Sequence, residues 1–131
     1  MDGGSTWQNF NGGVSLLWTN PSPTASFSPQ KINLDLSGFS GVLIKFYINF
    51  NGNHNVLGGY VAKGDSPRYV SVNAYNSVNS YWINYGRIGV SVDDSGVTFG
   101  TGYLTPNVQS SWTQQGDANG VPTEIYGLTV D

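Results

Sequence analysis

The sequence Val-Leu-Ile-Lys-Phe-Tyr-Ile-Asn-Phe, residues 42–50, is the longest strand signal in the chain. Every second residue in it is large and apolar; this set is Val42, Ile44, Phe46, Ile48 and Phe50. The intervening set is mixed in polarity and comprises Leu43, Lys45, Tyr47 and Asn49. Because successive side chains of a strand point to opposite faces, the pattern predicts a long central strand with the first set buried. The second set is expected on a half-solvated face.

Further strands are predicted on both sides of this one. Ile32, Leu34 and Leu36 alternate with polar residues, and Ser-Gly-Phe-Ser-Gly at 37–41 predicts a turn. Other strand signals lie at residues 14–19, 56–62, 68–75, 81–92, 97–99 and 122–130, and the Gly-Gly pair at 58–59 predicts a bulge. Polar segments at 20–30, 51–55 and 107–120 are predicted loops, with Phe27 as an anchor of the first and Trp18 in the core.

This spacing of turns indicates an all-β fold. About eight or nine short antiparallel strands at intervals of roughly 8–12 residues, without helical periodicity, predict a single β-sandwich or jelly-roll-like domain. Residues 14–131 would form this domain. Residues 1–13 are a glycine-rich lead or linker, although Trp7 and Phe10 indicate that it docks.

Both ends of the chain also carry a family resemblance. Residues 16–23 read Leu-Leu-Trp-Thr-Asn-Pro-Ser-Pro, residues 34–39 read Leu-Asp-Leu-Ser-Gly-Phe, and residues 121–128 read Val-Pro-Thr-Glu-Ile-Tyr-Gly-Leu. Together with Phe27 and residues 42–44, they resemble a small β-domain at the C-terminal ends of tail, baseplate and fibre proteins of phages and prophages of Gram-positive bacteria. Thr123-Glu124 departs from the Tyr-Lys of that family's ending. The resemblance implies that almost the whole chain is this one domain.

Composition restricts the classes of partner. The net charge of −3, the pI of about 4.7 and five scattered basic residues argue against nucleic acid as the main partner. Charged residues make up 10% of the chain, against a usual ~25%, and aromatic residues 14%. Neutral, aromatic-rich surfaces suit carbohydrate contacts or tight protein assembly, although glycine-rich turns in any β-domain would produce a similar composition. With no membrane-spanning segment and no signal peptide expected, lysis or particle assembly would carry the protein out of the cell.

Catalysis and metal binding find little support in the sequence. His54, the single histidine, lies in a predicted Asn/Gly loop tip, and no Gly-x-Ser-x-Gly motif is present. The acids could form a glycosidase pair only by chance placement. Asp93-Asp94-Ser95-Gly96 could hold calcium, but aspartates at a hairpin turn more often bond their own backbone. We therefore expect no enzymatic activity, no cofactor and no metal; the chain has no cysteine for a thiolate site.

Aromatic residues give the best candidates for ligand contact. Tyr81, Trp82 and Tyr85 cluster in a predicted strand, where Tyr81 and Tyr85 would share one face. Aromatic rings can stack on the apolar faces of sugars, while the predicted loop tip with Asn53, His54 and Asn55 could supply hydrogen bonds. The competing interpretation places the same aromatics in the core or in a subunit interface.

These features together predict an adhesive protein of a virion. We expect a distal module of a tail fibre or baseplate that binds a host cell-surface glycan or receptor. The alternative is a purely structural assembly or trimerisation knob without host ligand, and a small hydrolase is the least favoured class. Expected partners are host polysaccharide or other virion proteins, with neither nucleic acid nor membrane, and a homotrimer is expected. The protein would be made in the host cytoplasm, become part of the virion and be released on lysis.

Overall fold

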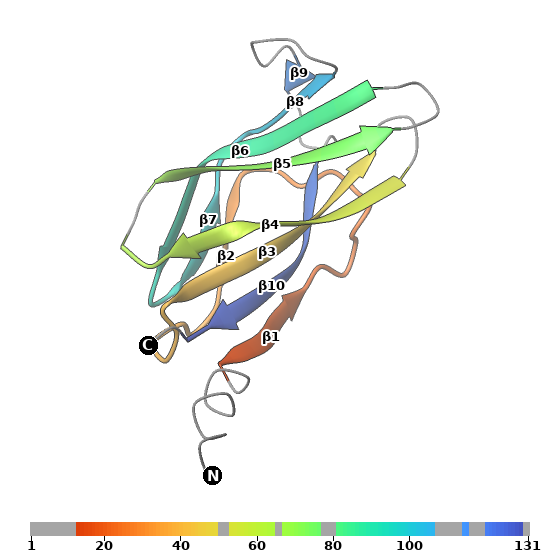
Figure 1. Ribbon diagram of the computed structural model, residues 1–131. Helices are drawn as coiled ribbons and strands as arrows, with labels where there is room; N and C mark the ends of the chain where they lie inside the picture. Colours follow the sequence, from red (N-terminus) through yellow and green to blue (C-terminus); the bar gives the residue numbers. More distant parts are fainter. Residues whose placement is uncertain are drawn as a thin grey trace, which may run out of the picture.

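The computed structural model describes residues 13–49, 53–64, 67–76, 81–106, 114–115 and 120–129, which form strands and no helix (Figure 1). The strands are β1 (Val14–Thr19), β2 (Gln30–Asn33), β3 (Gly41–Asn49), β4 (Asn53–Ala62), β5 (Arg68–Asn76), β6 (Tyr81–Asp93), β7 (Gly96–Phe99), β8 (Gly102–Pro106), β9 (Gln114–Gln115) and β10 (Val121–Leu128). The all-β prediction is confirmed. No helix that could span a membrane occurs in the described part of the chain.

The strands form two antiparallel sheets. One sheet has the order β1-β10-β3-β4, and Figure 1 shows β10 lying between β1 and β3. The other has the order β2-β7-β6-β8-β9, and β5 pairs with β6 beside this path. Buried residues from both sheets belong to one hydrophobic cluster, so the sheets pack against each other as a sandwich.

The core is built on β3, as the alternation predicts. Val42, Ile44, Phe46 and Ile48 are each 0% exposed. Val90 and Val92 from β6 and Val97 and Phe99 from β7 join them in the same buried cluster. Phe50, the fifth member of the predicted set, lies outside the described residues. Tyr47, from the opposite set, is also buried, at 8% exposure.

The segment between β1 and β2 is held by aromatic packing. The ring of Phe27 lies edge-on to Phe99, with centroids 5.4 Å apart, and edge-on to Trp18 at 6.1 Å. Phe27 is buried and Trp18 packs against the core, so both predicted roles are confirmed. Asn20, which is buried, donates from its side chain to the carbonyl of Pro122 at 2.9 Å and thereby joins this segment to β10.

The hairpin of β3 and β4 corrects one prediction and confirms another. The predicted loop tip is wrong at residues 53–55, because Asn53 pairs with Asn49 and His54 with Ile48 in the ladder. Backbone groups make these bonds, so a polar sequence does not end the pairing. Farther along, Leu43 pairs with Tyr60 and Lys45 with Leu57, which places both glycines 58 and 59 opposite one residue. The predicted bulge is therefore present.

Other boundaries also differ from the predicted ones. β2 ends at Asn33 rather than at residue 36, because the N–H groups of Leu34 and Leu36 donate to the carbonyls of Ser95 and Asp94, in the turn beside β2. Within the predicted loop 107–120, β9 pairs with Tyr103 and Leu104 of β8. β10 begins at Val121, one residue before the predicted start.

Candidate functional site

The predicted ligand residues lie in two different sheets. Tyr81, Trp82 and Tyr85 belong to β6, where Trp82 pairs with Tyr75 and Tyr85 with Val72. Asn53, His54 and Asn55 belong to β4 of the four-stranded sheet. Asn55 is exposed, but the side chains of the other five lie outside the described ones. The structure therefore does not unite the two groups in one sheet, and the stacking role of the β6 aromatics stays a prediction.

A different surface is formed by the face of the four-stranded sheet that points away from the core. Strand register places a row of large side chains across all four strands. Leu16 pairs with Tyr126, Tyr126 with Leu43, and Leu43 with Tyr60. All four are at least partly exposed. Directly opposed side chains in an antiparallel pair contact one another, so the row forms a continuous strip of apolar and aromatic groups.

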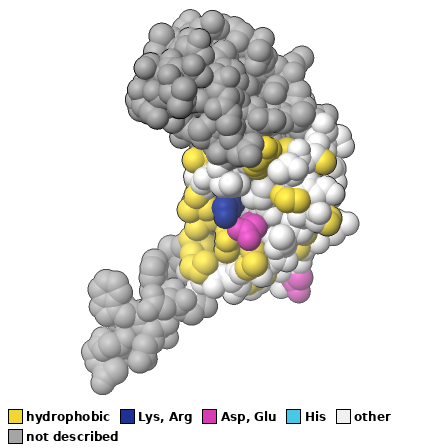
Figure 2. All heavy atoms as spheres, turned by 90° about the vertical axis from the view of Figure 1, so that its right-hand side faces the viewer, with side chains coloured by type: hydrophobic (Ala, Val, Ile, Leu, Met, Phe, Trp, Pro, Cys, Tyr) yellow, Lys and Arg dark blue, Asp and Glu magenta, His cyan; other side chains and the backbone are white. Residues whose placement is uncertain are grey.

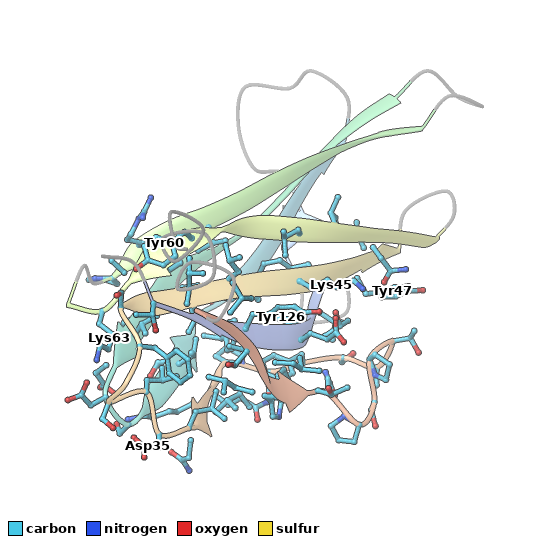
Figure 3. The ribbon with its side chains drawn as sticks, turned by 60° about the horizontal axis from the view of Figure 1, so that its bottom comes forward. Asp35, Lys45, Tyr47, Tyr60, Lys63 and Tyr126 are labelled. Atoms are coloured by element: carbon cyan, nitrogen blue, oxygen red, sulfur yellow. The ribbon has the colours of Figure 1, made fainter. Side chains whose placement is uncertain are left out.

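The neighbouring row carries the charges of this face. Glu124 pairs with Lys45, and Lys45 with Leu57. The Lys45 ammonium lies 3.5 Å from Oε1 of Glu124, and the Tyr126 hydroxyl donates to that same oxygen at 2.7 Å. Figure 3 shows Lys45 and Tyr126 on the adjacent strands β3 and β10, away from Lys63 and Asp35. We call both rows, with Val14, the outer face.

The hydrogen bond between Tyr126 and Glu124 shifts the pKa values of both groups. It lowers the pKa of the Glu124 carboxyl from its ordinary value of 4.5, and Lys45 lowers it further, although partial burial opposes both effects. The same hydrogen bond raises the pKa of the Tyr126 hydroxyl above 10.0. Both shifts stabilise the form in which Glu124 is a carboxylate and Tyr126 is a neutral phenol that donates to it.

The outer face is also where apolar side chains are exposed. Among the described residues, the large hydrophobic side chains with high exposure are Val14 at 45%, Leu16 at 52% and Leu57 at 58%. All three belong to this face. A shallow hollow of about 380 Å³ opens between Val14, Leu43, Lys45, Leu57 and Tyr126. Figure 2 shows hydrophobic side chains gathered around adjacent basic and acidic ones.

The acidic turn between β6 and β7 has a structural role. Oδ1 of Asp93 accepts hydrogen bonds from the backbone N–H of Ser95 at 2.8 Å and from its hydroxyl at 2.6 Å. Oδ1 of Asp94 accepts a bond of 2.7 Å from Lys63, whose ammonium also donates to the Leu36 carbonyl. The interpretation as a turn former that bonds its own backbone is confirmed for Asp93, whereas the Asp94 carboxylate pairs with Lys63 instead. No group of three or more potential metal-ligating side chains occurs among the described residues.

Comparisons with models of protein families, with curated proteins and with solved structures found no match. Any function of the outer face therefore has to be inferred from its own residues and geometry.

Sequence reasoning missed the outer face as a site. The alternation predicts that Leu43 and Lys45 lie on a half-solvated face, and residues 122–130 are a predicted strand. The missing information is the register that places Leu16 and Tyr126 beside Leu43. Leu16 and Tyr126 are more than 100 residues apart in the sequence. The site is therefore visible only when the pairing of strands that lie far apart in the sequence is known.

Proposed function

We propose that this β-sandwich is the binding module of a phage or prophage virion appendage, and that its outer face contacts a host cell-surface glycan. The observation that carries the proposal is the exposed strip of Leu16, Tyr126 and Leu43, bordered by the Lys45–Glu124 pair. The proposal includes no catalytic step.

The chemistry of this strip suits a sugar. The face of an aromatic ring is electron-rich, so it attracts the weakly positive C–H groups on the apolar side of a sugar ring. The polar groups of Glu124 and Lys45 lie at the edge of the strip, where hydroxyl groups of a stacked sugar would point. Apolar contact with a few placed polar groups is the usual composition of a ligand site.

The virion setting rests on the resemblance at both ends of the chain. Two of the resembling segments contribute residues to the outer face: residues 16–23 include Leu16, and residues 121–128 include Glu124 and Tyr126. An appendage would present many copies of the module, and weak contacts would then add up on one cell surface. The protein would accordingly belong to the virion and leave the host cell at lysis.

A whole-cell binding assay tests the proposal. The fluorescently labelled full chain is incubated with a panel of Gram-positive bacteria, together with the variants Tyr126→Ala and Leu57→Ser. We expect both variants to lose at least about tenfold in binding, a loss of the size produced by removing about 1.4 kcal/mol. Lys31→Met changes a residue of β2, in the other sheet; it is the control and should bind normally.

Two results would contradict the proposal. One is binding by Tyr126→Ala and Leu57→Ser equal to that of the parent. The other is binding that these variants keep and Trp82→Ala loses, which would move the contact surface to β6.

A second function, assembly within the virion, is favoured by the exposure of Val14, Leu16 and Leu57. Apolar side chains gathered on one face are typical of an interface between subunits. In that case the protein would form an oligomer, expected to be a trimer, and Leu16→Glu would dissociate it. The protein would then bind no host cell. Light scattering across a range of concentrations distinguishes this function from glycan binding by a monomer.

A further inference from the structure

We propose that the ligand of the outer face is an uncharged pyranose that offers two vicinal hydroxyl groups to the Lys45–Glu124 pair while its ring lies on Tyr126 and Leu43. This inference rests on the proposed function and specifies its substrate class. It commits the face to a small neutral sugar rather than to an acidic polysaccharide or a second copy of the chain.

The floor of the site determines how a ligand would lie. Tyr126 and Leu43 are directly paired across β10 and β3, so their side chains contact each other side by side. Val14 and Leu57 border the hollow of about 380 Å³ in which they lie. This volume is within the roughly 300–1,000 Å³ range of small-molecule sites. The floor is apolar, broad and open, as required by a ring that lies flat on it.

The polar edge determines which ligand groups can be recognised. An ammonium is only a donor and a carboxylate only an acceptor. Their separation of 3.5 Å places one donor and one acceptor side by side. Two hydroxyls on adjacent ring carbons match this pair, because one can accept from Lys45 while the other donates to Glu124. The carboxylate can accept about four hydrogen bonds, so its bond from Tyr126 leaves capacity for the ligand.

The charge balance of the edge argues for a neutral ligand. The Lys45 ammonium is already paired with the Glu124 carboxylate, which also accepts a hydrogen bond from Tyr126. A phosphate or uronate bound at Lys45 would lie close to the Glu124 carboxylate and would be repelled. The pair has no net charge, so it offers an acidic sugar no net attraction, whereas a neutral sugar can hydrogen-bond to both of its groups.

The size of the face argues against a second copy of the chain. The two rows and Val14 span three or four residues on each of four strands, so they cover roughly 19 × 12 Å of the sheet in projection. A stable protein interface buries about 800 Å² of accessible surface on each partner. A second copy would therefore need contacts beyond the outer face, whereas one or two sugar rings fit within it.

An NMR titration of the ¹⁵N-labelled full chain tests the inference. The probes are the methyl glycosides of glucose, galactose, rhamnose and N-acetylglucosamine, with methyl glucuronide and methyl galacturonide as the acidic counterparts of the first two. We expect amide shifts at residues 43–45, 57–60 and 124–126, with a Kd on the order of 1–10 mM for at least one neutral hexoside. Its acidic counterpart should bind at least about tenfold more weakly.

Variants test the role of the charged pair. Glu124→Gln should abolish most of the discrimination against the acidic glycoside, because it removes the repelling charge while keeping an acceptor. Lys45→Met should weaken binding of the neutral glycoside at least about threefold, and Lys31→Met should change neither value. Thermal unfolding of each variant checks that it is folded.

The outcomes separate this inference from the proposed function. Equal or tighter binding of the acidic glycosides, shifts confined to other residues, or no shift with any neutral glycoside would overturn the inference. So would self-association that Leu16→Glu abolishes, since a second copy would then cover the face. If host cells are still bound through the outer face in these cases, the proposed function stands without its sugar class. Glycoside binding without cell binding would instead contradict the proposed function.

Discussion

The two faces of the four-stranded sheet are made by the same strands but differ in every property that matters for function. On β3, the inward residues Ile44 and Phe46 are fully buried, whereas the outward residues Leu43 and Lys45 are partly exposed. The inner face is continuous with the core of the second sheet. The outer face has a hollow of about 380 Å³, and it combines Val14, three leucines and two tyrosines with one ion pair.

This difference separates stability from recognition. A side chain on the inner face is packed against neighbours on all sides, so its loss leaves a cavity. A side chain on the outer face has water on one side, so its loss changes the surface and little else. Substitutions on one strand should therefore affect either unfolding or binding, according to the face.

The largest effect is expected from Phe46→Ala. Phe46 is fully buried on β3, and truncation of such a phenylalanine costs about 3–5 kcal/mol because it creates a cavity. Unfolding in urea measures the change in free energy. A cost below about 1 kcal/mol would mean that the inner face is not the core of this sandwich.

A smaller effect is expected from Gly58→Ala, with Gly59→Ala as its matched control. A Cβ at residue 58 would lie 2.9 Å from the ring of Phe46, whereas one at residue 59 meets nothing within 4 Å. Overpacking of this kind costs about 1–3 kcal/mol, and a substitution without such contacts changes stability by about 0.5 kcal/mol or less. Equal costs for the two variants would show that the bulge does not direct residue 58 inward.

Leu57→Ser should change the free energy of unfolding by only about 0.5 kcal/mol, since the side chain is 58% exposed. Its effect should be on binding, as in the cell assay above. Chemical denaturation in parallel with that assay checks the separation. A loss of more than about 2 kcal/mol would show that Leu57 contributes to folding as an inner-face residue does.

The smallest effect concerns pH. The folded-state pKa of Glu124 is lowered, so its stabilising contribution is present above about pH 4.5 and is lost as the pH falls through the lower folded value. Asp35 and Asp93 behave similarly below 3.8, because hydrogen bonds from Ser37 and Ser95 lower their pKa values. Glu124→Gln should therefore make the fall of the thermal midpoint on acidification less steep. An unchanged slope would mean that the outer-face pair is not formed in solution.

Local patterns explain how much of the fold the sequence predicts. The alternation from Val42 to Ile48 is strong because each inward residue is large and apolar, and the glycines at 58 and 59 mark a bulge for lack of side chains. Polar segments are less informative about where a strand begins or ends. Residues 53–55 belong to β4 because ladder bonds involve the backbone alone. Tyr47 is buried although it alternates with the inward set, which periodicity does not predict.

The candidate site depended on information that local patterns lack. Leu16, Leu43, Tyr60 and Tyr126 come from four strands, and nothing in their local sequences states that they share a row. The ladders that align them contain three register shifts, which lie between Leu16 and Trp18, between Pro122 and Glu124 and between Leu43 and Lys45. A shift of one residue would have turned some of these side chains inward.

The position of β10 has a consequence for how the protein is made. β10 is the last strand in chain order, yet it lies between β1 and β3 and is hydrogen-bonded to both. During synthesis, at about 5–20 residues per second, β1 and β3 must wait for most of the chain to be translated before either gains this neighbour. Such long-range pairing slows folding and leaves strand edges open to aggregation in the meantime. A chain that is truncated before residue 121 would therefore have a divided sheet and would lack Glu124 and Tyr126.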